Sequence, residues 1–474
     1  MASGEVGSQA MARYGPVRVL AAVLATIIAV AFSLGWQWAA LHEAGHLRRS
    51  VAPLRAPTKF LTLPVQLSVL ANDRTLPVYG SSELYCCGDP YRPTQLFASQ
   101  PTGFDVYAFG RYGIGNLLFA ETFGALGRAL EGKKLVVIDS PPWFSNATEV
   151  DQSSYALNHS PEIAKTFIFS SPISLPLREA IARRMLDFPA TLAGDPVLGA
   201  AVRALADPTP LHLAAYRALV PIGKLEAWVE RVRGARLVLH FLHTLPAPES
   251  PQPGFRRRRF DWPALAARGT KIADRRDSTN PFGFPNETYA RLLKKGEIMG
   301  ALALYRAGST NREGQSFPPA TAAWQDNMSH STEWSDLGLL VRVLHELGAD
   351  PFVWSMPLPG VYDDYTPISA SARRAYYERW EQELPKLGVP WLDFRAADED
   401  IFFMTDTGAH FSPRGWIFAD RALDMFWHGK SNDEIHTALD DLAREVPPPP
   451  TATTWETRGR PSGAIPETVP GAIE

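Results

Sequence analysis

The strongest constraint on this chain is a run without any charged residue, Val19–Leu41, close to the N-terminus. As a helix, a run of this length crosses the hydrocarbon core of a bilayer. Trp36 and Trp38 lie near its end, where aromatic side chains prefer the membrane interface. A cleaved signal peptide is the alternative, but the apolar run is too long for one and no clear small-residue cleavage site precedes His42. The sequence therefore predicts an uncleaved transmembrane anchor at residues 19–41.

The orientation of this anchor does not follow from its flanking charges. Basic residues lie on both sides of the run. The excess of Lys and Arg that normally marks the cytoplasmic side therefore does not indicate which end of the anchor is cytoplasmic. The basic residues are Arg13 and Arg18 before the run and Arg48, Arg49, Arg55 and Lys59 after it. A first hydrophobic segment with a large domain behind it usually exports that domain. We therefore expect residues 1–18 in the cytoplasm and the domain outside, in the periplasm if the cell is Gram-negative.

Behind the anchor, the sequence alternates between strand and helix patterns, as in α/β proteins. Residues 134–139 form a continuous apolar run, which is typical of a buried parallel strand. Residues 160–250 are mostly helical in pattern. The net charge of -3 gives the chain as a whole no nucleic-acid signature. An α/β fold with a mostly parallel sheet is predicted, with further strands at 76–79, 104–109, 351–355 and 390–394 and helices at 116–130, 334–347 and 370–384.

The stretch Val78–Leu84 is where the chain is best placed to carry chemistry. A short apolar strand enters Gly80, Ser81 and Ser82, and Gly allows a sharp turn that exposes a serine at the carboxyl edge of a sheet. A helix after this turn would direct its N-terminal N–H groups at the same spot, which favours the oxyanion formed when serine attacks an ester. Gly110, after the next expected strand, could add a backbone N–H there or simply form a turn. Gly-Ser-Ser is also ordinary turn composition, so this stretch alone predicts only a turn.

A second segment, Thr405–Trp416, supplies partners for the serine. Asp406 and His410 lie four apart in it, just before an expected helix whose N-cap is Ser412. A serine needs a base to become nucleophilic, and the base needs an orienting partner. We assign these three roles to Ser82, His410 and Asp406.

Neither a metal nor a cofactor is expected. Cys86 and Cys87 are adjacent, which gives no disulfide framework and no zinc spacing. His240 and His243 have no accompanying Asp, Glu or Cys cluster, so core or surface histidines are favoured. The four arginines at 256–259 are interpreted as a solvated run, with a polyanionic acceptor near the membrane as the second interpretation.

Five separated segments resemble successive landmarks of the DltD family. They occur in one order between about residue 60 and residue 430, behind one N-terminal anchor, and together are far more specific than any single match. The chain departs from the family pattern in two places: three residues instead of two separate Asp406 from His410, and Pro142 stands where Gln is common. The five segments are Gly80–Leu84, Val137–Phe144, Asp261–Gly283, Tyr362–Tyr365 and Asp406–Trp416.

The resemblance implies an SGNH-hydrolase-like (flavodoxin-like) three-layer domain at residues 60–446, outside the cytoplasmic membrane. A helical insertion is expected at about 160–330, and the Pro-rich tail at 447–474 is expected to be disordered. The implied reaction is transfer of D-alanyl groups to an anionic envelope polymer, such as lipoteichoic acid in Gram-positive cells or another acceptor in Gram-negative cells. The implied partners are a membrane-bound O-acyltransferase and, through the pathway, the D-alanyl carrier protein.

The resemblance also selects between the two serines. SGNH enzymes place the nucleophile third in a Gly-Asp-Ser block, which on Gly80-Ser81-Ser82 selects Ser82. We expect the Ser81 hydroxyl to bond local backbone and Glu83 to favour the first turn of the following helix.

Two alternative functions stay open. An envelope polysaccharide O-acetyltransferase or esterase would use the same Ser, His and Asp. A non-catalytic scaffold would instead recruit the carrier protein to the membrane acyltransferase, and its histidine would be dispensable.

Overall fold

A five-stranded sheet with the order β2-β1-β3-β4-β5 forms the centre of the protein, and all its neighbouring strands run parallel. The predicted α/β class is confirmed, and this strand order is the flavodoxin-like one. β5 is shorter than the sequence predicted. The strands are β1 (Thr75–Gly80), β2 (Asp105–Gly110), β3 (Lys134–Asp139), β4 (Asp350–Ser355) and β5 (Trp391–Leu392). The computed structural model describes residues 4–85, 89–100, 102–144, 152–245, 259–277, 320–358, 360, 370–400, 402–405 and 410–448.

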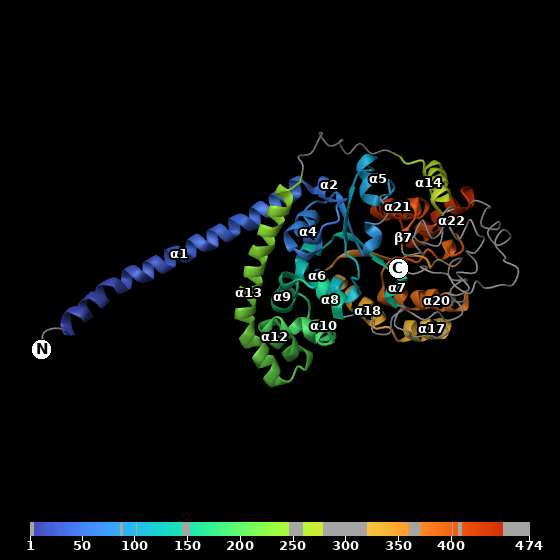
Figure 1. The fold of residues 1–474 in the computed structure, drawn as a ribbon. Coiled ribbons are helices and arrows are strands. Elements are labelled where there is room, and N and C mark those ends of the chain that lie inside the picture. Colours follow the sequence, from blue (N-terminus) through green and yellow to red (C-terminus); the bar gives the residue numbers. More distant parts are fainter. Residues whose placement is uncertain are drawn as a thin grey trace, which may run out of the picture.

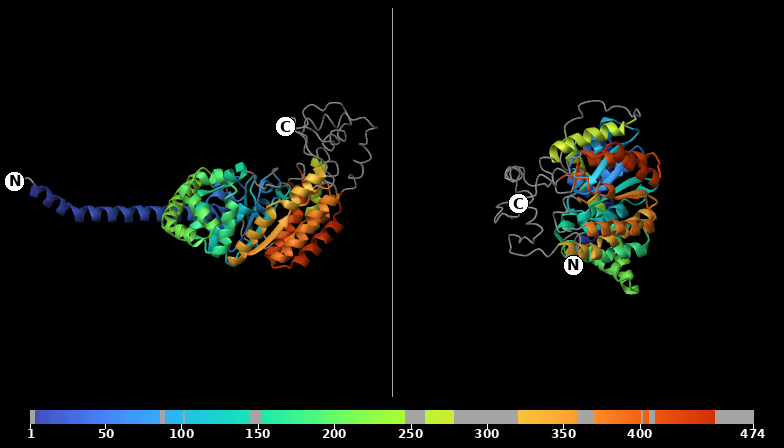
Figure 2. Two further views of the ribbon diagram at one scale, coloured as in Figure 1. Left: turned by 90° about the horizontal axis from the view of Figure 1, so that it is seen from below. Right: turned by 90° about the vertical axis from the view of Figure 1, so that its right-hand side faces the viewer.

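The strand residues alternate between two apolar cores, because successive side chains of a strand point to opposite faces of the sheet. Tyr79 and Val137 belong to the first core, whereas their neighbours Val78 and Val136 belong to the second. Every residue of β1 is buried. The sheet is therefore the middle of three layers, as Figure 2 shows.

Helices cover both faces of the sheet (Figure 1). The first core is closed mainly by α4 (Leu63–Leu70), α6 (Asn116–Leu126), α9 (Pro161–Ser170), α18 (Glu333–Glu346) and α20 (Ala370–Leu387). The second is closed by α5 (Pro93–Ser99), α14 (Trp262–Asp277), α21 (Pro413–Trp427) and α22 (Asn432–Glu445). α5 follows β1 onto one face of the sheet, and α6 follows β2 onto the other face. The direction of the strand order therefore reverses between β1 and β3, at their carboxyl ends.

Shorter elements and the helices between β3 and β4 complete the described fold. A two-stranded antiparallel pair, β6 (Met404–Thr405) and β7 (His410–Phe411), leads into α21. The 3-10 turns are η1 (Ser82–Leu84), η2 (Gly127–Leu130) and η3 (Arg395–Ala397). The remaining helices are α2 (Arg48–Val51), α3 (Pro57–Leu61), α7 (Pro141–Phe144), α8 (Gln152–Asn158), α10 (Leu175–Met185), α11 (Pro189–Ala193), α12 (Pro196–Ala206), α13 (Pro210–His243) and α17 (Ala320–His330).

The N-terminal helix α1 (Gly4–His46) projects away from the rest of the protein (Figures 1 and 2). Its segment Arg18–His46 is the one described helical segment that is long and apolar enough to cross a membrane, and the most apolar stretch of that segment is almost wholly exposed. This is consistent with the predicted single-pass anchor. The orientation of α1 and the domain boundaries stay predictions, and residues 449–474 of the tail lie outside the described residues.

α21 begins where the sequence predicted, because Ser412 caps its N-terminus and Pro413 occupies the first helical position. The Ser412 hydroxyl accepts the backbone N–H groups of Arg414 and Gly415, at 3.0 and 3.2 Å, and donates to the carbonyl oxygen of Phe402. Ser412 is fully buried. The cap therefore joins α21 to the chain that precedes β6.

We expect Ser412→Ala to lower the free energy of unfolding by about 1–2 kcal/mol, since a lost N-cap costs this much and no water can replace the buried hydroxyl. Ser431→Ala is the matched control. Ser431 caps α22 at an exposed site, where water can take over its hydrogen bonds, so its loss should cost less. Urea unfolding of the full-length protein in detergent measures both values. Equal losses in the two variants would contradict the role assigned to the buried cap.

Candidate active site

The carboxyl ends of β1 and β2 meet at two glycines. Gly80 and Gly110 are register partners at the last position of their strands. A Cβ on Gly110 would lie 2.5 Å from the carbonyl oxygen of Ser81, closer than any side chain tolerates. Glycine at this position therefore lets the turn after β1 pass directly over the end of β2.

Ser81 and Ser82 direct their hydroxyls to different partners. The Oγ of Ser82 lies 3.1 Å from Nε2 of His410. The hydroxyl of Ser81 instead donates to the carbonyl oxygen of Arg111 at 3.0 Å, and Ser81 is buried. Ser82 and His410 are both only half-buried, so a ligand can reach them. The serine selected from the sequence is the one that contacts the histidine.

The helix predicted to follow Ser82 is absent from the described residues up to Tyr85, where η1 forms a single 3-10 turn. This prediction was wrong because side chains hold the segment against β2. The carboxylate of Glu83 turns back and accepts the backbone N–H of Ser81, and the Tyr85 hydroxyl donates to the carbonyl oxygen of Ala108 at 2.8 Å. The first full helix after the turn is α5, which begins at Pro93. Among the described residues, no α-helix begins directly after Ser82, and Glu83 shapes the turn instead.

Two buried carboxyl groups lie at this edge of the sheet. Burial raises the pKa of Glu83 to about 7, with His410 and the N–H of Ser81 acting in the opposite direction. Burial raises the pKa of Asp139, the last residue of β3, to about 8, and the nearby negative charge of Glu83 raises it further. The amide Nδ2 of Asn116 is 3.4 Å from Asp139 and 3.0 Å from Glu333. The sequence reasoning gave Asp139 no role, although its position at the carboxyl end of a buried strand was the signal.

His410 is held by the short antiparallel pair and by α21. It pairs in register with Thr405 across β6 and β7, and Phe411 packs against Trp416 of α21. Arg414, the second residue of α21, forms a buried ion pair with Asp400 at 2.6 Å. These contacts hold β7 between β6 and α21, and the imidazole is presented to Ser82 from that support.

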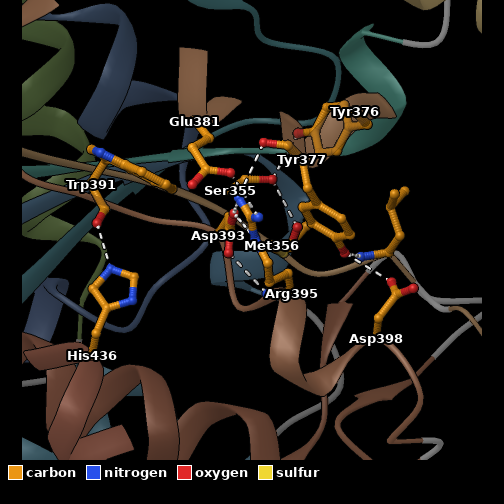
Figure 3. A network of polar contacts seen from close by, with 11 residues as sticks. Ser355, Met356, Tyr376, Tyr377, Glu381, Trp391, Asp393, Arg395, Asp398 and His436 are labelled. Carbon is orange, nitrogen blue, oxygen red and sulfur yellow. Dashed lines mark hydrogen bonds and ion pairs between the residues drawn. The ribbon is translucent and has the colours of Figure 1, made fainter. Parts of the chain in front are cut away.

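The chain before β6 is fixed by the network in Figure 3. The hydroxyl of Tyr377 donates to the Asp398 carboxylate at 2.8 Å and accepts the backbone N–H of Leu358 at 2.7 Å. Arg395 is paired with Asp393 at 2.6 Å and Glu381 at 3.1 Å. The network ties α20 and the end of β4 to the segment that leads towards His410.

Several predicted residues lie outside the described residues, Asp406 among them. The structure therefore brings together Ser82 and His410, with Gly110 one strand away, and leaves the role of Asp406 as a prediction. His240 and His243 are exposed on α13, and no group of His, Cys, Asp and Glu in the described part of the chain is arranged to hold a metal. Also outside are Cys86, Cys87, residues 256–258 and Tyr362–Tyr365.

The contact between Ser82 and His410 permits one kind of chemistry. An imidazole nitrogen within hydrogen-bond distance of a serine hydroxyl can take its proton as the oxygen attacks a carbonyl carbon. Because both residues are reachable, an ester or thioester could be the substrate. The geometry fits covalent acyl transfer or hydrolysis.

The raised pKa values of Glu83 and Asp139 predict a loss of stability as the pH rises. The folded protein favours the neutral form of both acids. Their contribution to the free energy of unfolding is therefore complete below about pH 4, where the same groups are also protonated in the unfolded chain. It is lost as the pH rises through about 7 for Glu83 and about 8 for Asp139. Asp139→Asn removes the buried carboxyl group, whose ionisation at high pH destabilises the folded protein. Thermal unfolding between pH 6 and 9 should show this variant gaining stability relative to the wild type as the pH rises, with Glu83→Gln doing so at a lower pH. A gap that stays constant across this range would contradict the prediction.

Comparison with known proteins covers most of the chain. The family model described as DltD protein matches residues 56–428. A "Protein DltD" from Bacillus subtilis is 26% identical over 371 residues, covering 78% of this chain and 87% of that protein. Those from Staphylococcus aureus and Lacticaseibacillus rhamnosus are each 22% identical, covering 78% and 90% of this chain and 85% and 93% of those proteins. The resemblance seen in the sequence is confirmed: the chain belongs to the DltD family.

Proposed function

We propose that this protein transfers D-alanyl groups to an anionic cell-envelope polymer through an acyl intermediate on Ser82. The observation that carries the proposal is the 3.1 Å contact between Ser82 Oγ and His410 Nε2, at the switch point of a flavodoxin-like sheet. DltD proteins take part in D-alanylation in the cell envelope, which supplies the substrate class. The proposed domain is SGNH-hydrolase-like and lies outside the cytoplasmic membrane, with α1 as its anchor.

The first half-reaction loads the serine. His410 removes the proton from Ser82 as Oγ bonds to the carbonyl carbon of an activated D-alanyl ester. The carbonyl oxygen becomes an oxyanion, and we keep the N–H of Gly110 as its proposed donor. The bond to the leaving group then breaks, and the leaving group takes the proton from His410. Asp406 is the proposed partner that orients the imidazole.

The second half-reaction unloads the serine onto the acceptor. A polymer hydroxyl gives its proton to His410 while its oxygen attacks the D-alanyl carbonyl, and Ser82 recovers a proton as it leaves. Cations beside the site support an anionic acceptor. Arg111 follows β2 directly, and its guanidinium lies within the electrostatic range of the exposed Arg55. Two cations beyond the carboxyl end of β2 would attract a phosphate-bearing chain towards this edge of the sheet.

Two partners are proposed with this reaction. A membrane-bound O-acyltransferase would deliver the D-alanyl group, which reaches it through the carrier protein of the pathway. An O-acetyltransferase or esterase acting on an envelope polysaccharide is the competing proposal, since Ser82 and His410 would serve it equally well. The mass of the adduct trapped on Ser82 decides between them, because an alanyl group adds a basic amine and an acetyl group does not.

Ser82→Ala should abolish alanyl ester on the envelope, because the attacking oxygen is lost. Ser81→Ala is the matched control: its hydroxyl contacts only backbone here, so esterification should persist while stability falls. Base-released D-alanine, measured in cells that express each variant at equal membrane level, gives the result. Normal esterification with Ser82→Ala would refute the covalent mechanism and favour a scaffold.

A serine-directed fluorophosphonate should label Ser82 in the wild type. His410→Ala should slow labelling by about 10²–10⁴-fold, the usual contribution of a general base. Labelling is followed by fluorescence, and the modified residue is identified by mass spectrometry of the peptide. Label on Ser81, or an unchanged rate in His410→Ala, would reverse the assignment.

A further inference from the structure

The long helix α13 has an apolar side that nothing in the described protein covers. Leu211, Leu225 and Leu237 are 76%, 60% and 59% exposed, and Ile222 is 52% exposed. Together with Val229 they recur at helical spacing along one side, which we call the outer face of α13. Exposed large hydrophobic residues in a row indicate a binding surface.

The opposite side of α13 is already used. Gly223 packs against the ring of Phe169, and Gly234 against the carboxyl group of Glu162, so closely that a Cβ at either glycine would overlap its neighbour. Ala227 and Val238 are buried on this inner side. A surface helix normally turns its apolar residues towards the core. Because the glycine contacts fix its rotation, α13 cannot turn its outer face inward and needs a second apolar environment.

α13 also lies against the membrane helix. The guanidinium of Arg236 stacks over the ring of Trp36 at 4.5 Å, and Ser33, Ala40 and Ala44 of α1 are buried. At about 1.5 Å per residue, Trp36 lies about 8 Å inside the end of the apolar run at Leu41. The part of α13 that touches Trp36 must therefore be at the level of the membrane interface if α1 spans the bilayer. Figures 1 and 2 show α13 on the side of the protein from which α1 emerges.

The charges of α13 fit a lipid surface. The helix carries five Lys and Arg residues and two Glu residues. Each Glu is paired with a cation, Glu226 with Lys165 at 2.8 Å and Glu230 with Arg233 at 2.7 Å. Exposed cations among the apolar residues suit the anionic headgroups of a membrane, as on helices that lie in the interface.

We propose that the outer face of α13 lies in the headgroup region of the membrane that α1 crosses. Leu225 and its apolar neighbours insert between the lipids, and Arg and Lys side chains, such as Lys224, reach the phosphates. This docking is independent of the acyl-transfer reaction and fixes the catalytic domain on the membrane at two places.

The test places a fluorescent label on the outer face of full-length protein in vesicles of phosphatidylcholine and phosphatidylglycerol. With Cys86 and Cys87 replaced by Ser, a single Leu225→Cys or Val229→Cys carries the label. Lys386→Cys on α20 is the control, since Lys386 is exposed on a helix that packs against α17 and α18. Spin-labelled lipid chains should quench the two α13 labels and spare the control, and aqueous iodide should do the reverse.

Two results would overturn the proposal. Equal iodide quenching at 225 and 386 would place the outer face in water, and protection of 225 from both quenchers would show that protein covers it.

A second experiment adds Leu225→Glu and Val229→Glu and measures the quenching of a label at Leu237→Cys. Lipid quenching at 237 should fall to the control level while α1 keeps the protein in the vesicle, as flotation shows. Unchanged quenching at 237 would mean that α1 alone sets the position of α13, and the proposal would fail.

Discussion

The candidate site depends on the position of β1 inside the sheet. β1 hydrogen-bonds to a parallel strand on each side, and each of its residues is buried, so its end cannot shift without breaking both ladders. The serine turn takes its position from that fixed end. A histidine 328 residues further along the chain then meets Ser82 only because the helices on both faces bring the C-terminal segment over the same edge. The contact between Ser82 and His410 therefore depends on the whole sheet and on the helices that cover it.

Buried polar contacts on the histidine side serve geometry more than stability. Arg414 with Asp400, and Arg373 with Asp398 at 2.9 Å, are buried pairs whose attraction is largely offset by the loss of hydration. Their directional contacts nevertheless hold the described parts of the chain between β5 and α21 in one arrangement. Apolar packing alone would leave such a segment, which has only very short strands, with more freedom. The polar network therefore does for β7 what the long strand ladders do for β1.

The sequence was a good guide where local pattern decides the structure. The apolar run of β3 and the serine-proline start of α21 were both predicted, because burial on both faces and helix capping depend on adjacent residues. It failed after Ser82, where the expected helix gave way to the contacts of Glu83 and Tyr85 with the end of β2. It also gave no role to Asp139, since a raised pKa follows from burial by residues distant in the chain. Such outcomes depend on tertiary neighbours that no local pattern contains.

The packing of α1 has a consequence for what the candidate active site can reach. α1 is buried at Ala40 and Ala44 against the body instead of being joined to it by a flexible linker. If α1 spans the bilayer as proposed, this packing would hold Ser82 at one height above the membrane. Under the proposed reaction, a polymer would then be modified only where its chain passes through that plane. The distance between the lipid anchor of such a polymer and its first modified unit would then correspond to the height of Ser82 above the membrane.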